Sequence, residues 1–136
     1  MQLKNNLYTI KQKQVDFPTE DNASVGTKAL LGSYELELNP SCFIYQVHFP
    51  GEPITPGVCI MQMGKEVLED ALDKPLQVAS VKNIKFLSII SPRETTSITY
   101  LFKKVELSED GKSVKAQLVV MAGEEAKAKI SFTLKA

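Results

Sequence analysis

The second half of the chain alternates apolar and polar residues with a period of two, and this pattern constrains the fold more than any other. Successive side chains of a β-strand point to opposite faces, so the alternation predicts strands with one buried face and one wet face. Within 126–134 every second residue is apolar, while Lys127 and Lys129 fall on the predicted wet face. The pattern recurs at 114–120 and 98–102. The sequence therefore predicts an antiparallel meander.

Glycine-containing turns separate these strands, because Gly111 and Gly123 readily adopt the positive φ that hairpins require. A further apolar run at 78–90 is interpreted as one long or bent strand, and the alternation at 34–38 predicts another. Residues 17–32 have a mixed pattern and receive no assignment.

One segment is strongly helical by its pattern. Apolar residues in 58–72 return at three- and four-residue spacing, and Pro75 blocks continuation. A single broad apolar helix followed by a meander predicts an α+β domain in which the sheet wraps the helix. The length of 136 residues is that of one ordinary domain, so we expect residues 1–136 to form a single domain.

Composition excludes several classes of function. Sixteen basic and sixteen acidic residues give a net charge of zero, so no global field favours nucleic acid or an anionic membrane, although a local basic patch for a carrier protein stays open. No apolar stretch approaches the ~20 residues that span a bilayer, and the first fifteen residues do not form a signal peptide. Cys42 and Cys59 make no disulfide framework. We expect a cytoplasmic protein with reduced thiols.

Residues 48–58 are the segment that carries chemistry. They contain the only histidine of the chain, His48, together with three prolines and two glycines, and they lead directly into the predicted helix. Such a loop is stiff and can hold a side chain in one pose. The helix start at Gly57 and Val58 presents free backbone N–H groups, which suit a carbonyl oxygen that gains negative charge. A nearby histidine suits proton removal next to that carbonyl.

This segment resembles the signature of the β-hydroxyacyl-ACP dehydratases, the hotdog enzymes of fatty acid elongation. The matching pattern is His48-Phe49-Pro50-Gly51-x-Pro53-x-x-Pro56-Gly57-Val58. A weaker resemblance covers 84–94, which corresponds to a strand and turn of the family. Together with the order of the last strands, the resemblance covers roughly residues 34–136.

The resemblance implies a hotdog fold, in which an antiparallel sheet wraps one central helix and a second copy completes the working dimer. In that family the histidine removes the α proton of a β-hydroxyacyl thioester, which assigns this role to His48. The backbone at Gly57 and Val58 would polarise the thioester carbonyl, and Phe49 and Pro56 would also contact the substrate. The implied substrate carrier is acyl carrier protein or CoA. No metal or other cofactor is implied.

Position 62 departs from the family, whose dimer places a glutamate or aspartate on the partner's helix fourteen residues after the histidine. Gln62 stands there in this chain. An amide can hydrogen-bond the leaving hydroxyl or a water, but it cannot deliver a proton at neutral pH. Glu66 lies one helical turn further on, where its side chain could reach back toward the site, but we interpret the acidic cluster around it as a solvated helix end.

Two smaller features remain open in the sequence. The thiol of Cys59 lies near a helix start, which would lower its pKa, although a small buried apolar role is the commoner one. Four aromatic residues are candidates for the wall of an acyl tunnel or for core positions: Phe43, Tyr45, Phe49 and Phe86.

Three functions are therefore open. The first is a lyase with His48 as base and Gln62 as the residue that orients the hydroxyl or a water. The second is a non-catalytic hotdog subunit that forms a heterodimer with an active dehydratase, instead of a homodimer or a larger oligomer of dimers. The third is an acyl thioesterase, which the dehydratase-like loop disfavours.

Overall fold

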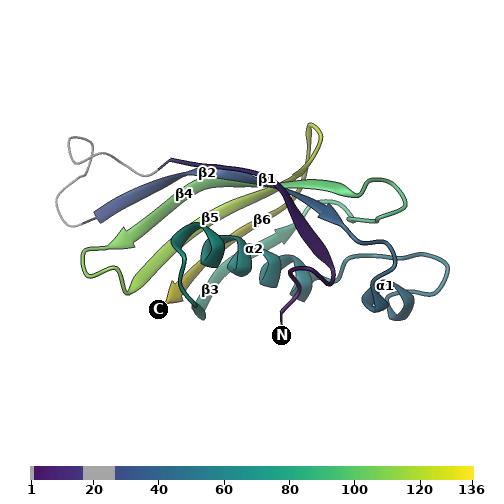
Figure 1. Ribbon diagram of the computed structural model, residues 1–136, viewed down its shortest axis with the longest axis horizontal. Helices are drawn as coiled ribbons and strands as arrows, with labels where there is room; N and C mark the ends of the chain where they lie inside the picture. The colour runs from purple at the N-terminus through teal and green to yellow at the C-terminus, as the bar shows by residue number, and fades with distance from the viewer. Residues whose placement is uncertain (1, 17–26) are drawn as a thin grey trace.

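A curved antiparallel sheet wraps one long helix in the computed structural model, which describes residues 2–16 and 27–136 (Figure 1). The sheet has six strands in the order β1-β2-β4-β5-β6-β3, and α2 lies along its concave face. The predicted α+β architecture is confirmed. In chain order the elements are β1 (Tyr8–Asp16), β2 (Thr27–Leu38), α1 (Phe43–Val47), α2 (Gly57–Leu72), β3 (Gln77–Phe86), β4 (Ser97–Ser108), β5 (Ser113–Ala122) and β6 (Glu125–Lys135).

The meander follows the predicted alternation. In β5 the apolar residues Val114, Leu118 and Val120 are buried, and β5 pairs with β4 on one side and β6 on the other. The two turns that join these strands contain Gly111 at φ 71° and Gly123 at φ 60°. Both angles lie in the left-handed region that glycine adopts without strain, which explains its use there.

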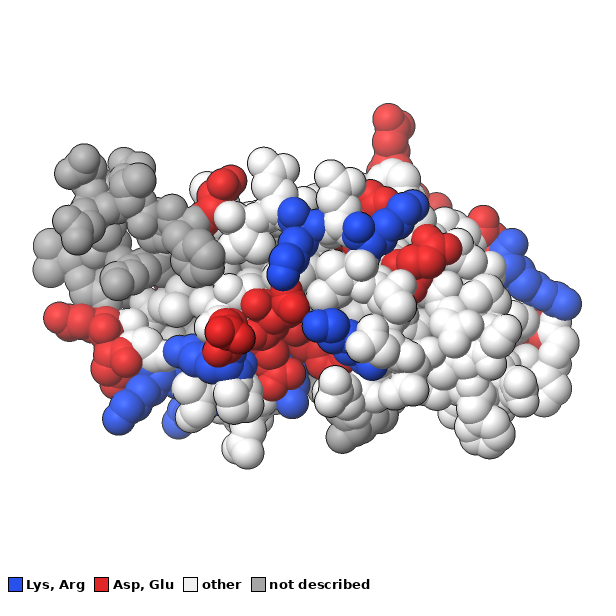
Figure 2. Space-filling model, viewed as in Figure 1, with Lys and Arg blue, Asp and Glu red and all other residues white. Residues whose placement is uncertain are grey.

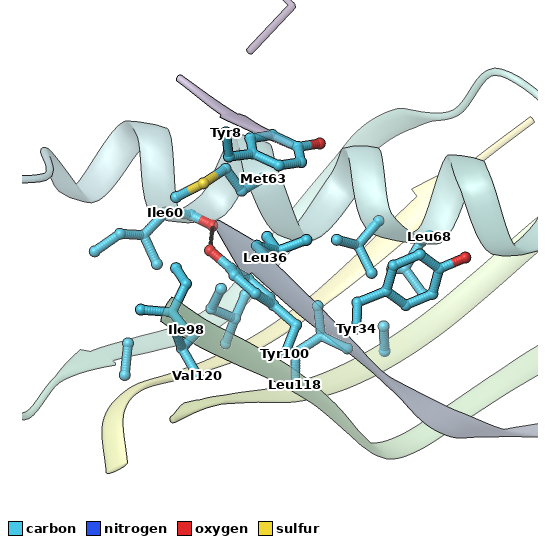
Figure 3. Close-up of a cluster of buried hydrophobic side chains, with 14 of the residues drawn as sticks. Tyr8, Tyr34, Leu36, Ile60, Met63, Leu68, Ile98, Tyr100, Leu118 and Val120 are labelled. Carbon is cyan, nitrogen blue, oxygen red and sulfur yellow. Dashed lines mark hydrogen bonds between the residues drawn. The ribbon is translucent and has the colours of Figure 1, made fainter. Parts of the chain in front are cut away.

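The core forms where α2 meets the concave face of the sheet. Ile60, Met63 and Leu68 are buried on the inner side of the helix (Figure 3). The hydroxyl of Tyr100, which comes from β4, donates a 2.7 Å hydrogen bond to the carbonyl oxygen of Ile60. This bond satisfies a buried polar group and fixes the N-terminal half of α2 against the sheet.

Four elements differ from the sequence predictions. The strand β1 was not predicted. The run at 78–90 is a strand only as far as Phe86, because the chain then leaves the sheet edge. The short helix α1 was not predicted, since five residues give no measurable periodicity. Residues 27–32, left unassigned, belong to β2, whereas 17–26 of the same unassigned stretch lie outside the described residues.

Lys127 is a correction to the predicted wet face of β6. Its side chain is only 5% exposed, and its Nζ lies 3.3 Å from Glu125 Oε2 and 3.9 Å from Glu94 Oε2. The connection between β3 and β4 covers it, because the N–H groups of Leu87 and Ser88 donate to the Lys127 carbonyl oxygen. Strand periodicity places a residue on a face, but it does not show which loop crosses that face.

Candidate functional site

The loop that follows α1 is closed by its own backbone. His48 N–H donates to the Ile44 carbonyl at 3.0 Å, and the His48 carbonyl accepts from Ile54 N–H at 2.8 Å. Between these points Phe49 and Glu52 exchange backbone hydrogen bonds of 3.1 and 3.0 Å. The predicted stiff loop is present, and its closure fixes the backbone that carries the histidine.

Side chains tie this loop to its neighbours. The hydroxyl groups of Tyr45 and Thr55 share a 2.8 Å hydrogen bond inside the protein, and Thr55 N–H donates to the Ile90 carbonyl at 2.8 Å. Burial raises the pKa of Tyr45 to about 12, so this residue is a neutral hydrogen-bonding group rather than an acid. The guanidinium of Arg93 donates to the Gly51 carbonyl. Two separate loops therefore hold the segment in place.

The start of α2 is uncapped. Its N-cap residue is Pro56, which offers no side-chain hydrogen bond. In the described parts of the chain, the N–H groups of Gly57 and Val58 donate to no protein acceptor. The tip of the Phe86 ring contacts Gly57 so closely that a Cβ there would lie 2.6 Å from Phe86 Cζ. The two N–H groups are therefore available as donors to an acceptor from outside the chain.

A groove of about 390 Å³ passes this helix start. Its lining is mostly apolar, and four of its nine residues come from the chain just after β3. The lining residues are Ile54, Thr55, Gly57, Ile60, Phe86, Leu87, Ser88, Ile89 and Ile90. An apolar groove beside free N–H groups suits a ligand with an apolar part and an oxygen acceptor.

His48 itself is exposed at the end of α1, with its ring edge-on to Phe49 and the ring centroids 5.6 Å apart. Several large apolar side chains near His48 and near the groove are also exposed. So many exposed apolar side chains in one region are unusual for a protein surface. They are Phe43, Val47, Phe49, Val58, Phe86, Leu87 and Ile89. Of the four aromatic candidates for a tunnel wall, Tyr45 belongs to the core and Phe86 lines the groove.

Gln62 lies on α2 and binds the next acidic residue along the helix. Its Nε2 donates a 2.8 Å hydrogen bond to Glu66 Oε2, which also accepts the backbone N–H of Leu3 at 2.9 Å. Glu66 Oε1 accepts the N–H of Lys4 at 2.8 Å and the hydroxyl of Tyr8 at 2.9 Å. Each oxygen of the Glu66 carboxylate thus has two donors.

The sequence-based interpretation of the acidic cluster around Glu66 as a solvated helix end is therefore wrong. Glu66 is 6% exposed because the N-terminal segment lies over it. The neighbouring Asp70 accepts hydrogen bonds from Lys13 at 2.8 Å and Tyr34 at 2.6 Å. Burial alone would raise the pKa of the Asp70 carboxyl, but these hydrogen bonds and the charges of Lys13 and Lys4 outweigh it and lower the pKa. Acidic side chains flanked by lysines gather over α2 in Figure 2.

The predicted site residues fall into two groups within one chain. Pro56, Gly57 and Val58 lie together at the start of α2, beside the groove. His48 and Gln62 make no hydrogen bond to each other, and Gln62 lines a different groove, on the Glu66 side of the helix.

Two further observations concern the chemistry of the site. Burial raises the pKa of the Cys59 thiol, so the small buried role that the sequence favoured is confirmed, and the alternative of a lowered pKa at the helix start is wrong. No cluster of three or more potential metal ligands occurs in residues 2–16 and 27–136. None of the helices described here is long and apolar enough to cross a membrane.

The sequence was compared with known families and proteins. Residues 28–117, more than half of the chain, match the ApeI-like family, which is described as ApeI dehydratase. The 3-hydroxyacyl-[acyl-carrier-protein] dehydratase FabZ of Wolbachia pipientis wMel is 36% identical over 58 residues. That match covers 35% of this chain and 38% of the Wolbachia protein.

Solved structures resemble the whole described fold at low identity. An uncharacterized protein from Erwinia carotovora subsp. atroseptica superposes with a TM-score of 0.65 at 18% identity, over 95% of this chain and 96% of its own. The dehydratase heterocomplex ApeI:P from Xenorhabdus doucetiae gives a TM-score of 0.59 at 15% identity, over 93% and 96%. The predicted hotdog fold is confirmed.

Proposed function

Because this chain belongs to the ApeI-like dehydratase family, we propose that it removes water from a 3-hydroxyacyl thioester in fatty acid or related acyl-chain biosynthesis in the cytoplasm. The observation that carries the proposal is the uncapped start of α2 beside an apolar groove. The thioester carbonyl oxygen binds the N–H groups of Gly57 and Val58, and the acyl chain lies along the groove. Phe49 and Pro56 border the same substrate.

His48 acts as the base in this proposal. Its imidazole takes the proton from the carbon next to the carbonyl, and that electron pair forms the new carbon–carbon double bond as the bond to the hydroxyl breaks. The closed backbone of the loop supports this role, since a base needs a fixed position. The exposure of the His48 side chain supports a site that residues of another chain complete.

The proton for the departing hydroxyl does not come from position 62. Gln62 has no acidic proton, and Glu66 already accepts two hydrogen bonds on each oxygen. The imidazolium formed at His48 is then the donor, so that one residue removes the proton and returns it to the leaving oxygen. Gln62 orients the hydroxyl or the water. No cofactor enters the reaction.

The working site draws on a second hotdog chain. The strand β3 is an edge of the sheet, and exposed apolar residues surround both the loop and the groove. Unpaired edges and large apolar patches are typical of surfaces that pair. A second copy bound there brings its own Gln62 toward His48 and covers Phe86 and Val58.

Turnover by the purified chain tests the proposal. With an enoyl thioester as substrate we expect hydration, and His48→Ala should lower kcat/KM by a factor of about 10² or more. Free thiol release measured in the same reaction detects thioesterase activity. Absence of hydration at several chain lengths, with the protein folded and dimeric by light scattering, would reject an independent lyase.

A second candidate function is a subunit that pairs with an active dehydratase. It is favoured by Gln62 and by the name of one structural relative, a dehydratase heterocomplex. In that case the chain contributes His48, or only a docking surface, to a mixed dimer. Co-purification with a dehydratase encoded beside it, together with turnover only by the mixture, supports this function. A stable homodimer that turns over unaided excludes it.

A further inference from the structure

Four lysines line one shallow groove on the convex face of the sheet, away from α2. The groove has a volume of about 350 Å³, and we call it the lysine groove after Lys82, Lys85, Lys103 and Lys129. All four side chains are exposed. A second groove of about 460 Å³ shares Lys82 with it and adds Lys104 and Lys115. The basic surface therefore continues across four neighbouring strands.

The position of two of these lysines is unfavourable for folding. Lys85 on β3 and Lys129 on β6 are direct partners in the antiparallel register, and both point to the convex face. Like charges directly opposite each other destabilise a sheet. Strand pairing therefore does not account for the lysines at these two positions.

The other two lysines lie at irregularities of the sheet. The register shifts between Val81 and Asn83, which leaves Lys82 without a partner on β6. The register of β4 with β5 shifts between Phe102 and Lys104, which leaves Lys103 without a partner on β5. Bulges of this kind change the direction of a side chain. Both bulges bring a lysine to the same groove.

Acidic side chains do not neutralise the lysine groove, whose lining contains no Asp or Glu. Among residues 2–16 and 27–136, none of the four lysines has a carboxylate within ion-pair distance. The second groove does contain one acid, since Glu106 lines it and pairs with Lys104 at 3.4 Å. A chain with zero net charge thus keeps a concentrated positive surface.

We propose that the lysine groove docks an acidic protein surface, namely that of the protein which carries the acyl thioester; this rests on the proposed function. The spread of the lysines over two connected grooves exceeds a small ligand, and exposed lysines on flexible stems suit a protein rim. Lys85 also directly precedes Phe86, whose ring contacts Gly57. A partner docked there lies on the strand that walls the site.

Lys85→Glu gives the sharpest test, because it changes stability and docking in opposite directions. The variant replaces a repulsive cross-strand pair with an attractive one, so Tm should rise by about 1–3 °C. For an enoyl thioester of acyl carrier protein, kcat/KM should fall about tenfold at low salt, and the loss should shrink as salt increases. The matched control is Lys112→Glu, which changes the net charge equally on the β4–β5 turn, outside both grooves.

Two small thioesters separate the possible outcomes. The pantetheine thioester lacks a protein surface, so its turnover should be the same in Lys85→Glu and in the unaltered protein. Equal losses for both substrates, or an unchanged rate with the carrier protein, would overturn the docking proposal. A loss confined to the CoA thioester would overturn it in favour of a nucleotide site. If no substrate turns over, binding of holo acyl carrier protein measured by calorimetry at low salt still decides, since Lys85→Glu should weaken it about tenfold.

Discussion

The two ends of α2 contrast in how fully the chain satisfies its own groups. Toward the C-terminal end, the Glu66 carboxylate is buried and has four hydrogen-bond donors, and Asp70 is bound by two side chains at 2.8 Å or less. At the N-terminal end, Gly57 and Val58 have free N–H groups and exposed apolar neighbours. The first end is satisfied within one chain, whereas at the second the described residues leave backbone donors and apolar side chains without partners.

This contrast separates stability from function along a single helix. A substitution at the satisfied end removes contacts that already exist in one chain, so it should reduce the free energy of unfolding. Under the proposed function, the groups at the open end contact a ligand or a partner, so a substitution there should reduce activity instead. The following predictions test this separation, from the largest expected effect on stability to the smallest.

Glu66→Ala should have the largest effect. It leaves the buried N–H of Leu3 and the hydroxyl of Tyr8 without their acceptor, and we expect the free energy of unfolding to fall by about 3 kcal/mol. Urea unfolding measures the loss, and hydrogen exchange should show faster exchange at Leu3 and Lys4. Glu69→Ala is the matched control, since Glu69 accepts one backbone N–H, that of Leu76, and pairs with Lys65 at 3.8 Å, so the variant should lose about 1 kcal/mol. Equal losses would contradict the role of Glu66.

Gln62→Glu should destabilise the protein by about 2 kcal/mol at pH 8. The introduced carboxyl would meet Glu66 Oε2, where the Nε2 of Gln62 now lies at 2.8 Å. Two carboxylates so close share a proton, which raises the pKa of the introduced group in the folded state above its unfolded value. Stability is therefore lost as pH rises, and unfolding at pH 5 should show a smaller difference from the unaltered protein.

Gln62→Leu is the control for this pH dependence, because it removes the same hydrogen bond without adding a charge. If both variants lose equal stability at pH 5 and pH 8, the two side chains do not interact as described. The raised pKa has a functional counterpart, since a carboxyl that keeps its proton near neutral pH can act as an acid. Gln62→Glu should then increase turnover where the missing acid limits the rate.

Asp70→Asn should cost about 1 kcal/mol at pH 7. Because the folded pKa of Asp70 is lowered, its contribution is present above the unfolded pKa and is lost as the pH falls through the folded value. The difference between the two proteins should therefore disappear as the pH falls below about 4. Thermal unfolding across this range measures it. A difference that is constant with pH would show that the hydrogen bonds do not depend on the charge.

Phe49→Ser should change the free energy of unfolding of a single chain by less than about 0.5 kcal/mol, since 54% of the side chain is exposed. Its effect should appear in dimer dissociation and in KM. Phe132→Ala, in the core, is the contrasting control and should cost about 3–5 kcal/mol. A large stability loss for Phe49→Ser under conditions where the chain is monomeric would mean that the open end packs within one chain.

Periodicity made most of the fold predictable. The strands that became β4, β5 and β6 and the helix α2 each have enough residues for a repeat to be measured, and the glycine turns between strands follow from backbone sterics. The helix α1 has five residues and carries no such repeat. Lys127 was misplaced because the β3–β4 connection covers it, and that crossing depends on contacts between distant segments.

The site was predictable only where one local segment supplies it. The loop from His48 to Val58 could be recognised from its own composition and pattern. The hydrogen bonds of Glu66 to Leu3 and Lys4 join residues more than sixty positions apart, and nothing in the local sequence of α2 signals them. The local sequence likewise does not signal the hydrogen bond from the Arg93 guanidinium to the Gly51 carbonyl. Long-range polar contacts of this kind require three-dimensional structure.

The hydrogen bonds at Glu66 also bear on how the protein can be handled. Trimming the chain past Lys4 would remove two of the four donors of the carboxylate and leave Tyr8 and Gln62 as the others. An affinity tag or a fluorescent label placed before Leu3 would lie within a few residues of the hydrogen bonds to Glu66, which in turn accepts the hydrogen bond from Gln62. Fusions after β6, which ends at Lys135, leave the hydrogen bonds of Glu66 to Leu3 and Lys4 in place.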